Sequence, residues 1–242
     1  MAYLNGQVLD GKTALVIGGS RGIGAAIVRR LRADGADVTF TYGGSADAAA
    51  ALASETGAQA VQSDAADRED TRRVVREAGA LDMLVYNAGV ALFAPATETD
   101  HDAVDRMIDI NVRGPFHAAT EASRQMNDGG RIVFIGSVNG DRMPMEGGAA
   151  YALTKSAVQG MTRGLARDLG ARNITVNNVQ PGPVDTDMNP ADGPMKDAMH
   201  SVMAIKRHAR PEEIAGMVAY LVGPEAGIVT GAQHTIDGGF GA

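Results

Sequence analysis

Short apolar runs alternate with helical patterns along nearly the whole chain of 242 residues. Between the runs, apolar residues recur at helical spacing, as Ile23, Ile27 and Leu31 do. We expect strands at 13–18, 37–42, 58–63, 81–86, 131–136, 174–179 and 234–236, and helices at 67–78, 100–126, 149–169 and 212–222. A break in the long second helix is expected near Gly114 and Pro115. This alternation predicts an α/β fold, a parallel sheet covered on both faces, in one domain over 1–242.

A glycine-rich turn follows the first expected strand and opens the first helix, with the order Gly18-Gly19-Ser20-Arg21-Gly22-Ile23-Gly24. Parallel sheets bind ligands beyond the carboxyl ends of their strands, and the free N–H groups at a helix start attract phosphate. The spacing G-x3-G-x-G differs from the general dinucleotide pattern G-x-G-x-x-G. A nucleotide-binding turn and a plain strand-to-helix turn therefore both stay open.

The end of the second expected strand bears on the choice of nucleotide. An acidic residue at this place would bind a ribose 2′-hydroxyl. Here Tyr42 is followed by two glycines and Ser45, without a carboxylate. Arg21, inside the glycine turn, could instead form a charge-assisted pair with a 2′-phosphate, although it could also be a solvated turn residue. These residues favour NADP over NAD.

Tyr151 and Lys155 are four residues apart and share one face of an expected helix. A nearby ammonium lowers the pKa of a phenol from about 10, which would suit Tyr151 to general acid–base chemistry. Ser137 could hydrogen-bond a substrate carbonyl, and Asn111 could hold a water beside Lys155. The alternatives are a solvated helix face for the pair, a turn cap for Ser137 and a satisfied buried amide for Asn111.

An ordered set of motifs extends from about residue 12 to 239: GGSRGIG (18–24), Asp64, NAG (87–89), Asn111, Ser137, Tyr151 with Lys155, PGPVDT (181–186) and DGG (237–239). This set resembles the short-chain dehydrogenases/reductases of the ordinary single-domain type. The resemblance implies a doubly wound, Rossmann-type sheet of about seven strands. It also implies an NADP(H)-dependent oxidoreductase of the carbonyl reductase type, acting on a small carbonyl or alcohol substrate, in a homotetramer or homodimer.

The resemblance assigns the catalytic roles to a tetrad of Asn111, Ser137, Tyr151 and Lys155. Tyr151 would protonate the developing alkoxide, Lys155 would hold the ribose, and Ser137 would polarise the carbonyl. Asn111 would anchor the water that returns the proton. The implied cofactor contacts are Gly18, Ser20, Arg21, Gly22, Ile23, Gly24, Tyr42, Ser45, Asp64, Asn87, Ala88, Gly89, Tyr151, Lys155, Pro181, Gly182, Val184 and Thr186.

The segment 187–210 matches the region that forms the substrate lid in the family. Met195, Met199 and Met203 are spaced four apart and could form one helix stripe. Plain packing of a short helix and an adaptable apolar substrate wall are both compatible with this stripe.

Strings in variable loops resemble one bacterial member of the family more closely, and this adds cyclic-di-GMP as a possible ligand. The alternative function is then a nucleotide-binding regulator of biofilm dispersal on the same fold. Arginine pairs at Arg68 with Arg72 and at Arg163 with Arg167 have a suitable spacing, but solvated helix charge is the favoured explanation of both. A second route is the phosphate-binding turn itself. Reduction of carrier-bound 3-oxoacyl groups ranks third, because Arg172 alone makes a poor docking face for an acidic carrier.

Composition excludes several other classes of protein. No cysteine is present, so disulfides and zinc–thiolate sites are impossible, which fits a cytoplasmic location. A net charge of −7 argues against binding a nucleic-acid polymer. No apolar run of about 20 residues predicts a membrane helix, and the five histidines show no spacing of metal ligands.

Overall fold

The structure, a computed structural model, describes residues 7–242, and the first six residues of the expected domain lie outside this part. Seven strands form one parallel sheet in the order β3-β2-β1-β4-β5-β6-β7. Their bounds are β1 Thr13–Ile17, β2 Asp37–Tyr42, β3 Gln59–Gln62, β4 Met83–Tyr86, β5 Arg131–Ile135, β6 Thr175–Pro181 and β7 Gln233–Ile236. The expected doubly wound α/β fold is confirmed.

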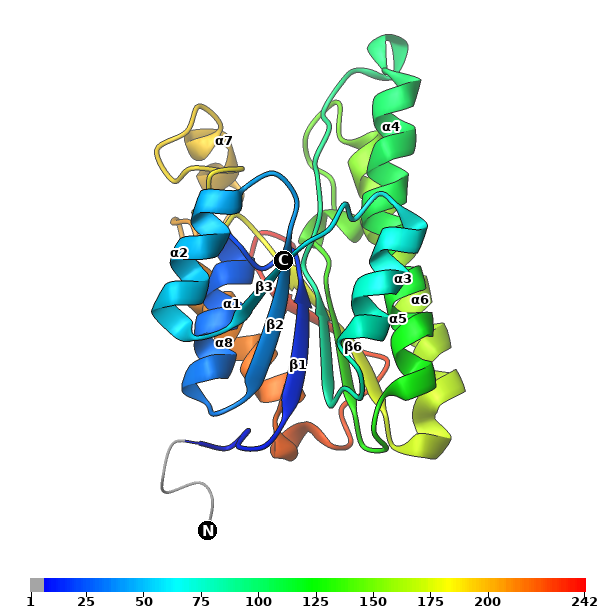
Figure 1. Cartoon of the computed structure of the whole chain (residues 1–242). Coiled ribbons are helices and arrows are strands. Elements are labelled where there is room, and N and C mark those ends of the chain that lie inside the picture. Colours follow the sequence, from blue (N-terminus) through cyan, green and yellow to red (C-terminus); the bar gives the residue numbers. More distant parts are fainter. Residues whose placement is uncertain (1–6) are drawn as a thin grey trace.

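Helices cover both faces of the sheet (Figure 1). One layer holds α1 (Gly22–Ala33), α2 (Ala46–Thr56) and α8 (Pro211–Val222). The other holds α3 (Arg68–Glu77), α4 (His101–Ile108), α5 (Gly114–Gln125) and α6 (Ala149–Leu169), and the short α7 (Lys196–Ser201) stands beyond the sheet. None of the helices in the described range 7–242 is long and apolar enough to cross a bilayer.

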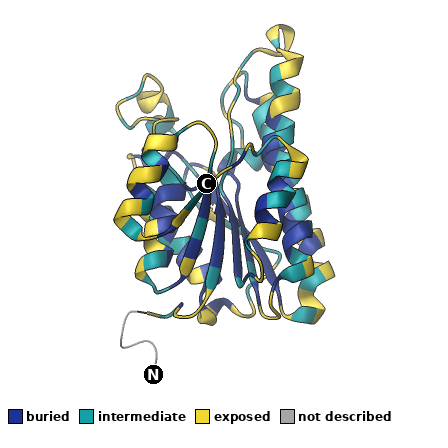
Figure 2. Ribbon diagram, viewed as in Figure 1, coloured by how far each residue is buried: buried dark blue, intermediate teal, exposed yellow. Residues whose placement is uncertain are grey.

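The inner strands β1, β4, β5 and β6 are buried on both faces, as the dark colour at the centre of the sheet in Figure 2 shows, whereas the edge strands β3 and β7 are partly exposed. In β1, Ala14 and Val16 pack into the core beneath α1 and α8, while Leu15 and Ile17 pack into the core beneath α5 and α6. Alternate side chains of a strand point to opposite faces, so an uninterrupted apolar run is needed here. The same property made these strands recognisable in the sequence.

The strand order reverses at β1, which pairs with β2 on one side and β4 on the other. Loops on the two sides of this point run in opposite directions and leave a crevice beyond the carboxyl ends of the strands. The glycine turn after β1 opens into this crevice, and the fold thereby places the expected site.

The long helix expected at 100–126 contains a π-helical turn, Asp109–Arg113, between α4 and α5. The N–H of Gly114 donates to the carbonyl of Asp109, and Pro115 has no N–H to offer to the carbonyl of Ile110. The hydroxyl of Tyr86 donates to that carbonyl at 2.8 Å instead. Gly114 is needed at this point because a Cβ there would lie 2.1 Å from the Tyr86 hydroxyl. The expected break is therefore a widened turn that β4 supports.

Phe134 in β5 offers a test of the core beneath the crevice. Its side chain is 1% exposed, so Phe134→Ala should lower the free energy of unfolding by about 3–5 kcal/mol through lost burial and a new cavity. Urea denaturation measures this quantity. Ile228→Ala is the control, because Ile228 is 92% exposed and its removal should change stability by less than about 0.5 kcal/mol. Similar losses for both variants would contradict the packing described.

Candidate active site

A cleft of about 730 Å³ lies beyond the carboxyl ends of the strands. It is lined by the glycine turn, the ends of β2, β4, β5 and β6, and the first turns of α6. All the site residues expected from the sequence line this cleft except Gly24 and Asn111. Segments as far apart in the chain as the glycine turn and Thr186 therefore share one cavity.

The glycine turn packs tightly against the carboxyl end of β4. Gly18 has a φ of +81°, and a Cβ on it would lie 2.6 Å from the backbone nitrogen of Ala88. Gly24 lies just behind the turn, where a Cβ would lie 2.1 Å from the carbonyl oxygen of Gly18. Gly24 thus allows α1 to approach the turn, whereas Gly18 lets the backbone face the cleft.

The start of α1 leaves its N–H groups available for an anion. Its N-cap residue, Arg21, makes no capping hydrogen bond through its side chain, and the first turn contains no acid. By contrast, Asp67 and Asp100 cap α3 and α4. An uncapped helix start facing a glycine-lined cleft suits a phosphate group. The residues present therefore fit the pyrophosphate of a dinucleotide.

The end of β2 is open and uncharged. Tyr42, Gly43, Gly44 and Ser45 all line the cleft, and Ser45 begins α2 without a side-chain capping bond. A hydroxyl without a capping bond and the nearby guanidinium of Arg21 suit a ribose 2′-phosphate better than a 2′-hydroxyl. Arg21 already has one partner that the sequence did not reveal, Asp187, at 3.2 Å.

Two polar residues fix the loops around the cofactor part of the cleft. The amide of Asn87 donates to the carbonyl of Gly18 at 2.7 Å, which ties the end of β4 to the glycine turn. Asp64 follows β3, accepts the N–H of Ala66 at 2.9 Å and lies 3.4 Å from the guanidinium of Arg106. Arg106 is a cleft residue that sequence reasoning missed, because it comes from α4 with no motif around it.

The pair on α6 is buried. The ammonium of Lys155 donates to the carbonyl of Ile135 at 3.1 Å and lies 5.6 Å from the centre of the Tyr151 ring. Burial lowers the pKa of Lys155 to about 8. Burial also raises the pKa of Tyr151, and a hydrogen-bonding effect of Ser137 lowers it by less. The net shift of Tyr151 is opposite to the expected one, since desolvation of the phenolate outweighs its polar surroundings.

Ser137 lies directly after β5, and its side chain lines the cleft close to Tyr151. Its hydroxyl also accepts the N–H of Asn139 at 3.1 Å. Ser137 therefore caps a short turn through its oxygen, and this cap leaves the hydroxyl proton free for the expected contact with a substrate carbonyl.

Asn111 occupies the π-helical turn, and all of its amide is engaged. It accepts the N–H of Val90 at 3.0 Å and donates to the carbonyl of Val90 at 2.8 Å. It also donates to the hydroxyl of Thr154 at 3.1 Å, next to Lys155 on α6. The buried-amide reading is therefore correct for its contacts, and Asn111 ties the loop after β4 to the helix that carries Tyr151.

The substrate part of the cleft is apolar. Phe93 is 50% exposed, and its ring centre lies 5.6 Å from that of Tyr151. Met195 and Met199 also line the cleft, whereas Met203 is buried with Val138 and Phe240. The methionine stripe thus divides between the substrate wall and the core. Phe93 was missed because it lies in a loop, where apolar periodicity gives no signal.

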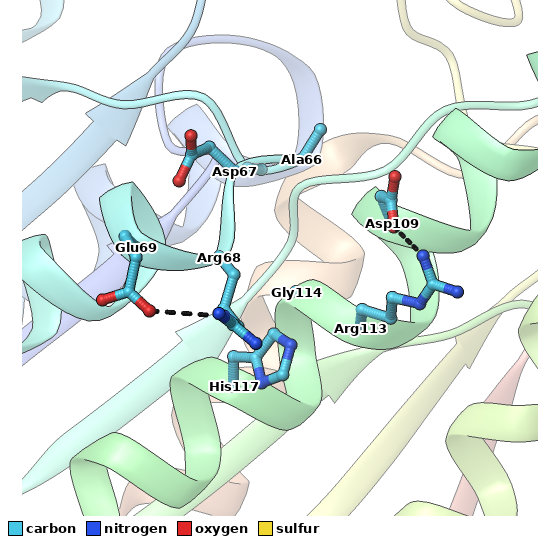
Figure 3. A pocket seen from close by; sticks show the side chains of 9 residues that line it. Ala66, Asp67, Arg68, Glu69, Asp109, Arg113, Gly114 and His117 are labelled. Carbon is cyan, nitrogen blue, oxygen red and sulfur yellow. Dashed lines mark hydrogen bonds and ion pairs between the residues drawn. The ribbon is translucent and has the colours of Figure 1, made fainter.

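A second cavity of about 610 Å³ lies beside the cleft, and both are lined by Ala65 (Figure 3). Arg68 and Arg113 face it, and each is paired with an acid of its own helical segment, Glu69 and Asp109. Burial and the nearby arginines lower the pKa of His117. None of the expected catalytic or cofactor residues lies here, and both arginines that face it, including Arg68, already have an acidic partner.

No cluster of three or more metal-binding side chains occurs within residues 7–242. The polar groups of the cleft are hydroxyls, amides, one ammonium and two guanidinium–carboxylate pairs, Arg21 with Asp187 and Arg106 with Asp64. Such groups suit a phosphorylated dinucleotide and a neutral carbonyl compound.

Comparison with known proteins agrees with this geometry. A family model described as enoyl-(acyl carrier protein) reductase matches residues 17–241. The cyclic-di-GMP-binding biofilm dispersal mediator protein of Escherichia coli K12 is 66% identical over 96% of this chain and 98% of its own length.

Solved structures extend the comparison to the fold and the cofactor. The crystal structure of BdcA with NADPH matches with a TM-score of 0.96 and 65% identity over 97% of this chain and 96% of its own. A short-chain dehydrogenase from Burkholderia cenocepacia J2315 with NADP matches with a TM-score of 0.94 and 47% identity, over 97% and 99%. The expected cofactor, NADP(H), is the one bound in both relatives. The chain belongs to the short-chain dehydrogenase/reductase family.

Proposed function

We propose that the protein is an NADPH-dependent reductase that converts a carbonyl compound into an alcohol. The observation that supports this most directly is the placement of Ser137, Tyr151 and Lys155 in one cleft with the uncapped start of α1. The three side chains supply the groups needed for proton transfer to a carbonyl oxygen. The start of α1 supplies the N–H groups needed to bind a phosphorylated cofactor.

NADPH, when bound, supplies the hydride for the reaction. The residues of this chain handle the proton. With its pKa raised by burial, the hydroxyl of Tyr151 stays protonated at neutral pH and acts as the acid that protonates the substrate oxygen. Ser137 donates its hydroxyl proton to the same oxygen and stabilises the charge that develops there.

Lys155 and Asn111 support this step from behind. The ammonium of Lys155 lies close enough to the Tyr151 ring to stabilise the tyrosinate left after proton transfer. It also reaches towards the cofactor side of the cleft, where it holds the ribose. Asn111 positions α6 through its hydrogen bond to Thr154. It also lies close to Lys155, because a Cβ on Gly89 would lie 3.5 Å from the amide oxygen of Asn111 and 3.6 Å from the ammonium of Lys155. A water held there would return the proton.

A second candidate function is binding of cyclic-di-GMP, the ligand in the name of the E. coli relative. The arginines considered for it on α3 already have acid partners: Arg72 contacts Glu121 at 2.7 Å, and Arg68 contacts Glu69 at 3.2 Å. The other pair considered, Arg163 with Arg167 on α6, lines neither of the two cavities, so the phosphate-binding turn of the cleft is the better candidate. Cyclic-di-GMP and NADPH would then compete, and a titration with both ligands would detect this directly.

Action on carrier-bound acyl groups has weaker support. Arg172, the arginine considered for docking, donates to Asp128 at 2.8 Å and to the carbonyls of Ser123 and Met126. Its guanidinium is therefore held within the chain.

A homodimer or homotetramer that pairs α6 fits the exposed side of that helix. Leu153 is 56% exposed there, and no other part of the described chain lies within 4 Å of a Cβ placed on Gly160 or Gly164.

The first prediction concerns Tyr151. Purified protein should oxidise NADPH in the presence of at least one member of a panel of ketones and keto esters. Tyr151→Phe should lower kcat by about 10²- to 10⁴-fold, because it removes the general acid, while NADPH binding stays within a few-fold of the wild type. Stopped assays and a binding titration measure the two quantities.

Turnover that survives in Tyr151→Phe would exclude the proposed acid. Absence of turnover with every ketone, despite tight NADPH binding, would favour the nucleotide-sensing alternative. The same protein would then be titrated with cyclic-di-GMP.

The second prediction concerns pH. Since the pKa of Lys155 is about 8, against an ordinary value of 10.5, its ammonium loses its proton as the pH rises through this range. The charged form holds the ribose, so NADPH affinity should be full below pH 8 and should fall above it. Lys155→Met should bind NADPH more weakly and show no such dependence between pH 7 and 9.5. A parallel dependence in both proteins would assign the effect to another group.

The third prediction concerns the 2′-phosphate. Arg21→Ala should weaken NADPH binding about tenfold and NADH binding much less, because a charge-assisted hydrogen bond contributes about 1.5–3 kcal/mol and this one is partly screened by solvent. Titration of the nicotinamide fluorescence measures both affinities. Equal losses for the two cofactors would defeat the assignment of Arg21.

A further inference from the structure

One ion pair links the cofactor side of the cleft to the segment that covers the substrate. Nη1 of Arg21, in the glycine turn, donates to Oδ2 of Asp187 at 3.2 Å. Asp187 is the residue after Thr186, at the start of the segment that continues to Met195 and Met199. Both partners line the cleft. The only strong cation proposed for the 2′-phosphate therefore already faces an anion.

The backbone holds Asp187 in this place. Thr186 and Asn189 form a two-way pair, in which the N–H of Asn189 donates to Thr186 at 3.0 Å and that of Thr186 to Asn189 at 3.4 Å. Asp187 lies at the tip of this tight turn. The base of the turn touches the glycine loop, since a Cβ on Gly22 would lie 3.0 Å from the methyl group of Thr186. The path of the backbone thus holds Asp187 beside Arg21.

NADPH and NADH differ only in the 2′-phosphate. A phosphate near Arg21 must either take the guanidinium from Asp187 or share it with a second anion. Either arrangement weakens the binding of the phosphorylated cofactor and leaves the other unaffected. We propose that Asp187 is a second determinant of cofactor choice, which lowers the preference for NADPH that Arg21 creates. This inference rests on the proposed function of the cleft.

The size of the effect follows from the exposure of the pair. The side chains of Arg21 and Asp187 are 60% and 76% exposed, so solvent screens their interaction. Exposed pairs of this kind change an equilibrium by about two- to fivefold. The effect should also shrink at high salt, since the Debye length falls to about 3 Å at 1 M ionic strength.

Asp187→Asn tests the proposal in a titration of NADPH and NADH followed by nicotinamide fluorescence. We expect the variant to bind NADPH about two- to fivefold more tightly and to bind NADH as the wild type does. Asp192→Asn is the matched control: it removes the same charge from the same exposed segment, and Asp192 makes no ion pair with Arg21 in the described chain. It should leave the ratio of the two affinities unchanged.

A double-mutant cycle separates the contact from a general charge effect. In the Arg21→Ala background, Asp187→Asn should change the NADPH affinity much less than it does alone. An equal gain in both backgrounds, an equal gain from Asp192→Asn, or an unchanged ratio of NADPH to NADH affinity would overturn the role of Asp187. Wild-type protein that binds neither cofactor would instead overturn the proposed function, and this inference with it.

Discussion

Close packing between the glycine turn and the end of β4 is the constraint on which the rest of the site depends. Without a side chain at Gly18, the glycine turn can lie against Ala88, and its Gly18 carbonyl can accept the amide N–H of Asn87; without one at Gly24, α1 can approach the turn from behind. Asn87 begins the loop that contains Val90, and the backbone of Val90 forms two hydrogen bonds with the amide of Asn111. Asn111 in turn donates to Thr154 on α6. Hydrogen bonds at both ends of the segment 87–90 thus connect the glycine turn to the helix that carries Tyr151 and Lys155.

This connection holds the two parts of the cleft, the glycine turn and the residues of α6, in a fixed arrangement. The loops themselves are short, and each is anchored at a strand end or a helix start. Burial then sets the acid–base properties: it keeps Tyr151 protonated and brings the pKa of Lys155 to about 8. Polar neighbours act on this background, and they modify it without reversing it.

Much of the architecture could be predicted from the sequence, because strands buried on both faces are mostly apolar, as β1, β4 and β5 are, and because glycines mark backbone contacts. The strands around residues 13–18 and 131–136 and the helix at 149–169 were placed on this basis. What could not be read depends on contacts between distant segments. Arg21 and Asp187 are 166 residues apart, and Phe93 lies in a loop without periodicity. The direction of the Tyr151 pKa shift likewise depends on burial, which a motif does not encode.

The π-helical turn at Asp109–Arg113 also limits how the chain can change in length. A residue advances an α-helix by about 100°, so deletion of one residue here would rotate α5 relative to α4 by more than a quarter turn. Ala118, Ala119 and Ala122 would then leave the sheet, where all three are completely buried. Asn111 would leave Val90 at the same time. Segments such as the loop between Ser137 and Tyr151 can absorb an inserted residue. The π-helical turn cannot, because its length sets both which side of α5 faces the core and where Asn111 lies.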